Sequence, residues 1–110
     1  MANSKSNSDR HAYATIDTAP GADGYWCDSV SPAKKNATPM WFSYGGGGVA
    51  TVTLQFQRPG DTGWTDYTTD ETLEDGAMFI MEAWGAGVKW RAGVKNGGLS
   101  SGTNRIGFDW

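Results

Sequence analysis

The chain contains one histidine and one cysteine, so few side chains are available for nucleophilic or metal chemistry. A Ser-His-Asp triad would have to use His11, and a polar N-terminal segment is not expected to hold an imidazole in place. Cys27 has no base next to it in the sequence, so we expect a buried, inert thiol. Zinc sites need several Cys and His ligands. The sequence therefore predicts a protein that is not an enzyme and binds no cofactor or metal.

Two other stretches resemble ligand sites. The acidic run Asp70, Glu71, Glu74 and Asp75 supplies the carboxylates that calcium prefers, but its spacing matches no known calcium loop. We expect a solvated turn there, and calcium binding by Asp70–Asp75 stays open. The run Gly45–Gly48 lacks the lysine and the helix that follow a phosphate-binding loop, so we expect a turn between strands.

Six tryptophans are the remaining candidates for a binding surface. An exposed row of indoles would bind sugars, because the C–H faces of sugars pack on aromatic rings. Trp90 and Trp110 fall at inward positions, whereas Trp41, Trp64 and Trp84 are assigned to neither side. We expect most of them to pack in the core. A sugar-binding surface is the alternative, and an exposed co-planar pair of tryptophans would favour it.

The elements that position these residues are strands with one apolar side. Residues 49–57 alternate strictly, with Ala50, Val52, Leu54 and Phe56 on one side and threonine and glutamine on the other, wet side. Residues 87–95 alternate in the same way, and their polar side carries the basic strip Lys89, Arg91 and Lys95. This strip either pairs with acidic groups of a neighbouring chain or stays solvated. Shared alternation across three strands predicts a core of Val52, Leu54, Phe56, Val88, Trp90, Val94, Ile106 and Phe108.

The N-terminal residues 1–24 differ in composition from the rest of the chain. They are rich in Ser, Asn, Asp, Ala and Gly, and Tyr13 and Ile16 are their only sizeable apolar side chains. Such a segment buries too little apolar surface to order itself. We therefore predict an extended arm over residues 1–24 that a partner chain holds through Tyr13 and Ile16, and a domain over residues 25–110. A chain that begins at Gly24 would then stay folded. The alternative is that the segment packs on its own domain.

Bulk properties narrow the class of protein. The chain has 110 residues, which suits one domain, and a net charge of −3, so we expect no nucleic-acid partner. No apolar run is long enough to cross a membrane, and the N-terminus lacks the apolar segment of a secretion signal. A single cysteine excludes an internal disulfide and suits assembly in a reducing cytoplasm.

The spacing of strand and turn signals predicts the fold class. We expect about six to eight short strands separated by glycine-rich turns, which is typical of a sandwich. The segment 77–84 is apolar on both sides, and we interpret it as a doubly covered strand, with a helix over residues 71–83 as the rival. The predicted fold is all-β: a single antiparallel β-sandwich, jelly-roll or immunoglobulin-like, with an extended N-terminal arm.

Residues 48–110 resemble small β-sandwich proteins of tailed bacteriophage particles. The resemblance is carried by Val49-Ala-Thr-Val-Thr-Leu-Gln-Phe-Gln57, Trp64, Trp90-Arg-Ala-Gly-Val-Lys95, Gly97-Gly98 and Ser101-Gly-Thr103. It implies a capsid decoration protein, a head-fibre part or a tail-associated protein, and it brings no catalytic motif. Residues 1–44 lie outside the resemblance.

The leading hypothesis is a structural virion protein of a tailed bacteriophage. It decorates or stabilises the capsid, or forms part of a head fibre, and its N-terminal arm anchors it. Its partners would be other capsid or tail subunits and further copies of itself, with assembly in the cytoplasm of the bacterial host. The alternative is a carbohydrate-binding module of a tail-associated protein that recognises a receptor. Head, neck or tail location, copy number and symmetry are left open.

Overall fold

The computed structural model describes residues 3–31, 40–45, 49–70, 78–81 and 87–109. Every regular element among them is a β-strand, and none is a helix that could cross a membrane. The strands are β1 (Ser4–Asn7), β2 (His11–Ile16), β3 (Tyr25–Trp26), β4 (Met40–Gly45), β5 (Val49–Ala50), β6 (Val52–Gln57), β7 (Thr65–Asp70), β8 (Met78–Met81), β9 (Lys89–Val94), β10 (Leu99–Ser101) and β11 (Asn104–Asp109).

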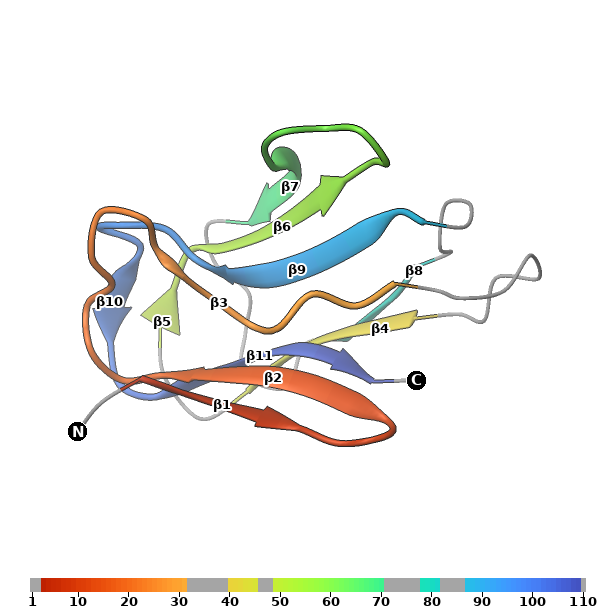
Figure 1. The fold of residues 1–110 in the computed structure, drawn as a ribbon. Coiled ribbons are helices and arrows are strands. Elements are labelled where there is room, and N and C mark those ends of the chain that lie inside the picture. Colours follow the sequence, from red (N-terminus) through yellow and green to blue (C-terminus); the bar gives the residue numbers. More distant parts are fainter. Residues whose placement is uncertain (1–2, 32–39, 46–48, 71–77, 82–86, 110) are drawn as a thin grey trace.

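Two antiparallel sheets pack face to face, as the predicted sandwich requires (Figure 1). One sheet has the strand order β1-β2-β11-β4-β8, and the other has the order β3-β9-β6-β7. The short pair β10-β5 lies at one end of the sandwich. A strand at Met78–Met81 agrees with the strand interpretation of residues 77–84, and the remaining residues of that segment lie outside the described part.

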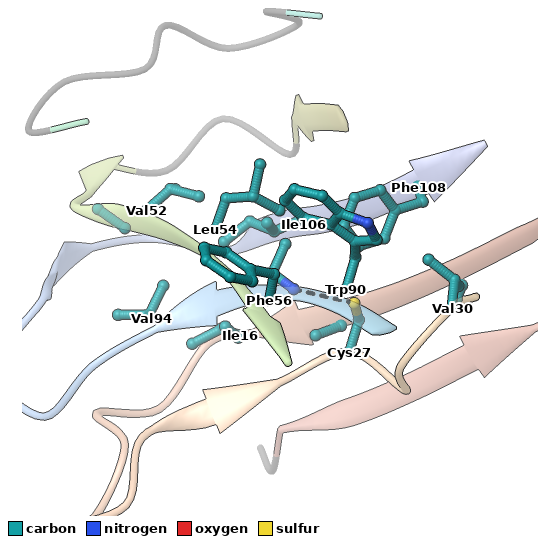
Figure 2. Close-up of a cluster of buried hydrophobic side chains, with 14 of the residues drawn as sticks. Ile16, Cys27, Val30, Val52, Leu54, Phe56, Trp90, Val94, Ile106 and Phe108 are labelled. Atoms are coloured by element: carbon teal, nitrogen blue, oxygen red, sulfur yellow. Dashed lines mark hydrogen bonds between the residues drawn. The ribbon is translucent and has the colours of Figure 1, made fainter. Parts of the chain in front are cut away.

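The core lies between the two sheets (Figure 2). All residues predicted for it are buried, because alternation places the large apolar side chains of β6, β9 and β11 on the inner faces. In the register of the second sheet, Leu54 lies opposite Ala92 and Phe56 lies opposite Trp90. The small side chain of Ala92 leaves room beside the large ring of Trp90, which is fully buried at 0% exposure.

The predicted extended arm is wrong for residues 4–16. These residues form the β1–β2 hairpin, and β2 pairs along its whole length with β11, from Asn104 opposite Ile16 to Asp109 opposite His11. Ala12, Ala14 and Ile16 are buried in the core. The physical reason is that β2 alternates with period two like the other strands of the sandwich, so its inner side faces the core.

The predicted wet side of residues 49–57 is also wrong in part. Thr51 interrupts the strand between β5 and β6 by donating its backbone N–H to Gly98. Thr53 and Gln55 point to the outer face of β6, yet they are only 1% and 7% exposed. Gln55 is hydrogen-bonded by Arg91 of β9 and Thr53 lies between Gly93 of β9 and Thr69 of β7, so these two positions are closed to water.

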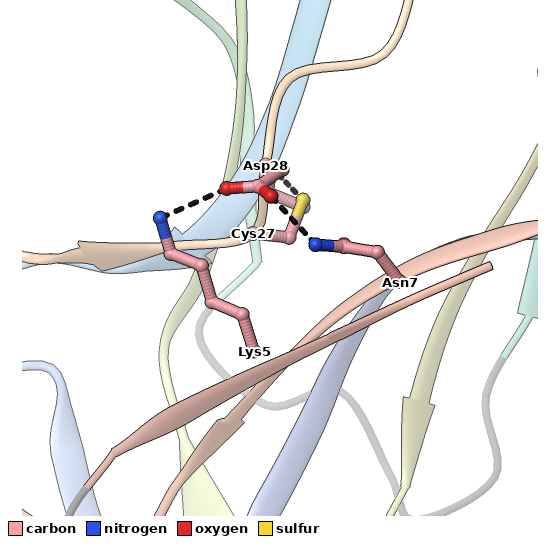
Figure 3. Close-up of polar contacts among 5 residues, drawn as sticks. Lys5, Asn7, Cys27 and Asp28 are labelled. Carbon is pink, nitrogen blue, oxygen red and sulfur yellow. Dashed lines mark hydrogen bonds and ion pairs between the residues drawn. The ribbon is translucent and has the colours of Figure 1, made fainter.

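β1 is an edge strand, and two of its polar side chains reach Asp28, which follows β3 of the other sheet (Figure 3). Lys5 lies opposite Ala14 and Asn7 opposite Ala12, so both point to the inner side. Lys5 donates to one Asp28 oxygen at 3.0 Å, and Asn7 donates to the other at 2.6 Å. These hydrogen bonds, that of Lys5 first, lower the pKa of Asp28. An inward-pointing charge on an edge strand disfavours pairing with a strand of another molecule, so β1 is protected against such pairing.

Candidate functional site

The outer face of the β3-β9-β6-β7 sheet carries the most organised set of surface side chains in the described part of the chain. At its centre is Arg91, in the middle of β9. Its guanidinium carbon lies 4.4 Å from the ring centroid of Trp26 and 4.4 Å from that of Trp64. Trp26 comes from β3, on one side of β9, and Trp64 precedes β7, on the other side. Cation–π contacts thus hold the guanidinium from two directions. Below, this set of Trp26, Arg91 and Trp64 is called the indole clamp.

A chain of hydrogen bonds extends the indole clamp across β6 to β7. Arg91 donates its Nε–H to Gln55 Oε1 at 2.9 Å, and Gln55 donates its Nε2–H to Asp66 at 2.8 Å. Lys95 pairs with the other oxygen of Asp66 at 2.5 Å. The hydrogen bond from Lys95, followed by that from Gln55, lowers the pKa of Asp66. Each polar side chain therefore has its orientation fixed by the next one.

A close backbone approach positions Trp26. Gly93 lies opposite Trp26 in the β3–β9 register. A Cβ atom on Gly93 would lie 2.0 Å from the Tyr25 carbonyl oxygen, so only glycine fits at this position. The indole is also held by its own N–H, which donates to the carbonyl oxygen of Asp23 at 2.8 Å. The position of Trp26 is thus set by its backbone neighbours as well as by Arg91.

The outer face of the other sheet repeats this arrangement. Gly107 of β11 lies opposite Tyr13 of β2, and a Cβ atom there would lie 2.0 Å from the Ala12 carbonyl oxygen. The guanidinium of Arg105 lies 5.0 Å from the Tyr13 ring centroid, and the Tyr13 hydroxyl donates to Asp109. Both faces therefore use an Arg-x-Gly sequence with an aromatic residue opposite the glycine.

His11 is held in place, contrary to the expectation for a polar N-terminal segment. Ser6 Oγ lies 3.2 Å from its Nε2 and Ser8 Oγ lies 2.9 Å from its Nδ1, while its ring stacks on Tyr13 at 4.6 Å. The β1–β2 hairpin supplies this order. The hydrogen-bond partners of the ring in the described part are hydroxyls, so no carboxylate orients it as in a Ser-His-Asp triad. Within the described residues, no three His, Cys, Asp or Glu side chains gather as a metal site.

Cys27, the residue after Trp26, is buried among the residues of the hydrophobic core. Its sulfur accepts a hydrogen bond from the backbone N–H of Ala92 at 3.3 Å. Burial raises the pKa of the Cys27 thiol to about 11, which agrees with the expected inert thiol.

We expect the folded protein to resist thiol-modifying reagents at Cys27. Near pH 8 the thiolate is scarce and the reagent has no path to the sulfur, so a chromogenic disulfide reagent should react only after urea unfolds the chain. The measurement is the reaction rate in buffer against that in urea, with free cysteine as the control. Fast reaction of the native protein, without loss of its circular dichroism signal, would contradict the burial of this thiol.

The predicted partner-binding residues fall into different environments. Ile16 is fully buried in the core, which contradicts its role as an anchor for a partner. Tyr13 is half-buried against its own sheet. Lys89 is exposed on the outer face of β9, Arg91 is in the indole clamp, and Lys95 is paired with Asp66. The last three thus share one face, as the basic strip requires.

Sequence reasoning missed the residues that organise this face. Trp26, Trp64, Gln55 and Asp66 lie on three different strands or their flanks, and the alternation of one strand says nothing about its neighbours. The available signal was the repeated Arg-x-Gly, at Arg91–Gly93 and Arg105–Gly107. A glycine inside a strand often marks a close approach by another group.

The described tryptophans do not form an exposed co-planar pair. Trp90 is in the core, Trp26 is buried at 9% exposure, and Trp64 is half-buried against Arg91. The side chains of Trp41, Trp84 and Trp110, and the acidic run beyond Asp70, lie outside the described part. No family model, curated protein or solved structure matches this chain, so the fold and the site stand on their own geometry.

Proposed function

We propose that this chain is a non-enzymatic structural protein of a tailed-bacteriophage particle. It acts as a capsid decoration or head-fibre protein that attaches to other virion subunits and to further copies of itself. The resemblance of residues 48–110 supports the virion assignment, and the β-sandwich agrees with the fold that this resemblance implies. The proposal includes assembly in the cytoplasm of the bacterial host.

The observation that carries the proposal is the outer face with the indole clamp. Tryptophan and arginine are the residues that most often dominate the energy of protein–protein interfaces. Here Arg91 and both indoles are already fixed by Gln55, by Gly93 and by one another. Side chains that are ordered before binding lose less conformational entropy on association. This face is therefore suited to contact with another protein.

The proposal does not include attachment through an extended N-terminal arm. Residues 4–16 are paired with β11, and the edge that β1 presents is protected by inward-pointing Lys5. A rigid face is the better candidate for attachment. Among the described tryptophans, Trp26 and Trp90 are buried and Trp64 is half-buried against Arg91, so they do not form the exposed pair that would favour carbohydrate binding.

The proposal is tested on particles purified from infected host cells. An antibody raised against the chain should label particles that band in a density gradient, and the chain should remain with them after a wash in moderate salt. A host cytoplasmic protein of similar size, followed in the same gradient, is the control for trapped material. Recovery of the chain only in the free-protein fractions would overturn the proposal.

A further inference from the structure

Arg91 retains unused hydrogen-bonding capacity. Its Nε–H is taken by Gln55, but its two terminal Nη groups donate no hydrogen bond to any residue in the described ranges. The indoles of Trp26 and Trp64 lie against the guanidinium, so the edge that carries the Nη groups is what remains for a ligand. Arg91 is half-buried, and part of the side chain is open to solvent.

The charge of Arg91 is not neutralised by a carboxylate in the described part of the chain. The nearest acidic member of the network, Asp66, already pairs with Lys95 and accepts from Gln55. Partial burial lowers the pKa of Arg91 from its ordinary value, because desolvation disfavours the charged form. A guanidinium in this position remains charged at neutral pH, and an added counter-charge would offset its desolvation.

The neighbouring residues extend the positive charge along β9. Lys89 lies on the same outer face, two residues from Arg91, and forms no ion pair with the described residues. Arg91 and Lys89 thus form a local positive region, although the net charge of the chain is −3. Complementary potential at an interface selects an acidic partner and disfavours a basic one.

We propose that Arg91 binds a carboxylate from an acidic segment of a partner protein, and that Lys89 supports it from the side. This rests on the proposed role of the outer face as a contact surface, and it names the chemistry of the partner. A guanidinium matches a carboxylate with two parallel N–H···O bonds, which a lysine ammonium does not form. The indole clamp holds the Arg91 guanidinium in place before the partner binds. The partner contributes an Asp or Glu side chain on an extended segment.

The test uses the isolated full chain and a short acidic peptide as the probe. The peptide is Gly-Glu-Asp-Glu-Gly with blocked ends, and the control peptide replaces the acids by their amides, Gly-Gln-Asn-Gln-Gly. Nuclear magnetic resonance follows the side-chain Nε–H signal of Arg91 and the indole N–H signals of Trp26 and Trp64 at low ionic strength. We expect saturable shifts of these signals with the acidic peptide and none with the amide peptide.

Two variants separate recognition through the paired N–H groups of the Arg91 guanidinium from general electrostatic attraction. Arg91→Lys keeps the charge but loses the paired N–H donors, and it should weaken peptide binding about tenfold. Lys89→Gln removes a charge but keeps the paired N–H donors, and it should weaken binding less than Arg91→Lys. Thermal melting of each variant checks that it is folded. If Arg91→Lys does not fold, the titration of the natural chain decides, since the Arg91 signal itself must shift.

Three results would overturn the inference: equal binding of both peptides, unchanged binding by folded Arg91→Lys, or shifts confined to residues away from Arg91. Tighter binding of inorganic phosphate than of the acidic peptide would also overturn it, because the site would then be a phosphate site. The peptide titration does not depend on a particle. The virion assignment therefore stands or falls by the particle labelling, and the carboxylate site by the titration.

Discussion

A chain that begins at Gly24 is expected to lose its folded structure. The deletion removes β1 and β2, and with them the hydrogen-bonding partner of β11 on one side. It also removes Ala12, Ala14 and Ile16 from the space between the sheets, where each is buried. Replacing Ile16 alone by alanine should already destabilise the protein by about 2–5 kcal/mol. A small domain with a stability of about 5–15 kcal/mol does not tolerate the loss of a whole internal strand.

Far-UV circular dichroism and the width of the thermal transition measure this result. The control is a chain that begins at Asn3, which keeps both strands of the hairpin and should melt like the full chain. A cooperative transition in the chain from Gly24, at a temperature near that of the control, would show that residues 4–16 do not belong to the core. Adding a peptide of residues 3–23 offers a further check, because it should restore the transition if β2 pairs with β11.

The sequence was most informative where large apolar residues alternate. In β6 and β9 each inward position carries Val, Leu, Phe, Trp or Ala, and in β11 Ile106 and Phe108 are inward, with the buried Asn104 as the polar exception. Burial of such apolar side chains is the main favourable term in folding. Alternation alone therefore predicts that Trp90 and Phe108 face the core, without any knowledge of the neighbouring strands. Both are fully buried.

The composition and the periodicity of the N-terminal strand point in opposite directions. Residues 11–16, His-Ala-Tyr-Ala-Thr-Ile, alternate with period two, but their inward residues include two alanines, Ala12 and Ala14, which bury little area. Composition alone therefore suggested that the ordering entropy would not be offset. The backbone pairing with β11 and the full burial of Ile16 supply what the alanine side chains do not.

The outer face could not be predicted from one strand at a time. Thr53 and Gln55 are polar and point away from the core, so alternation predicts that water covers them. Gln55 is held between Arg91 of β9 and Asp66 of β7, and the sequence does not state which strands are neighbours. Long side chains such as Arg91 bury their stems on a sheet surface while their polar ends form hydrogen bonds.

Trp90→Ala is expected to destabilise the protein by about 3–5 kcal/mol, the range for removing a fully buried large aromatic ring. The Trp90 ring centroid lies 5.6 Å from that of Phe56 and 5.3 Å from that of Tyr67, so the substitution removes these aromatic contacts as well as buried area. Urea unfolding, followed by circular dichroism, measures the change in free energy. Trp90→Phe keeps a ring in the same space and should lose less.

The residue next to Trp90 provides the matched control for the strand register. A shift of one residue in β9 would exchange its inner and outer faces, placing Lys89 and Arg91 between the sheets and Trp90 in water. In the observed register Lys89 is exposed, so Lys89→Ala should change the free energy of unfolding by no more than about 0.5 kcal/mol. A large loss for Lys89→Ala together with a small loss for Trp90→Ala would reverse the two faces. It would then also remove Arg91 from the outer surface, and with it the basis for the carboxylate site.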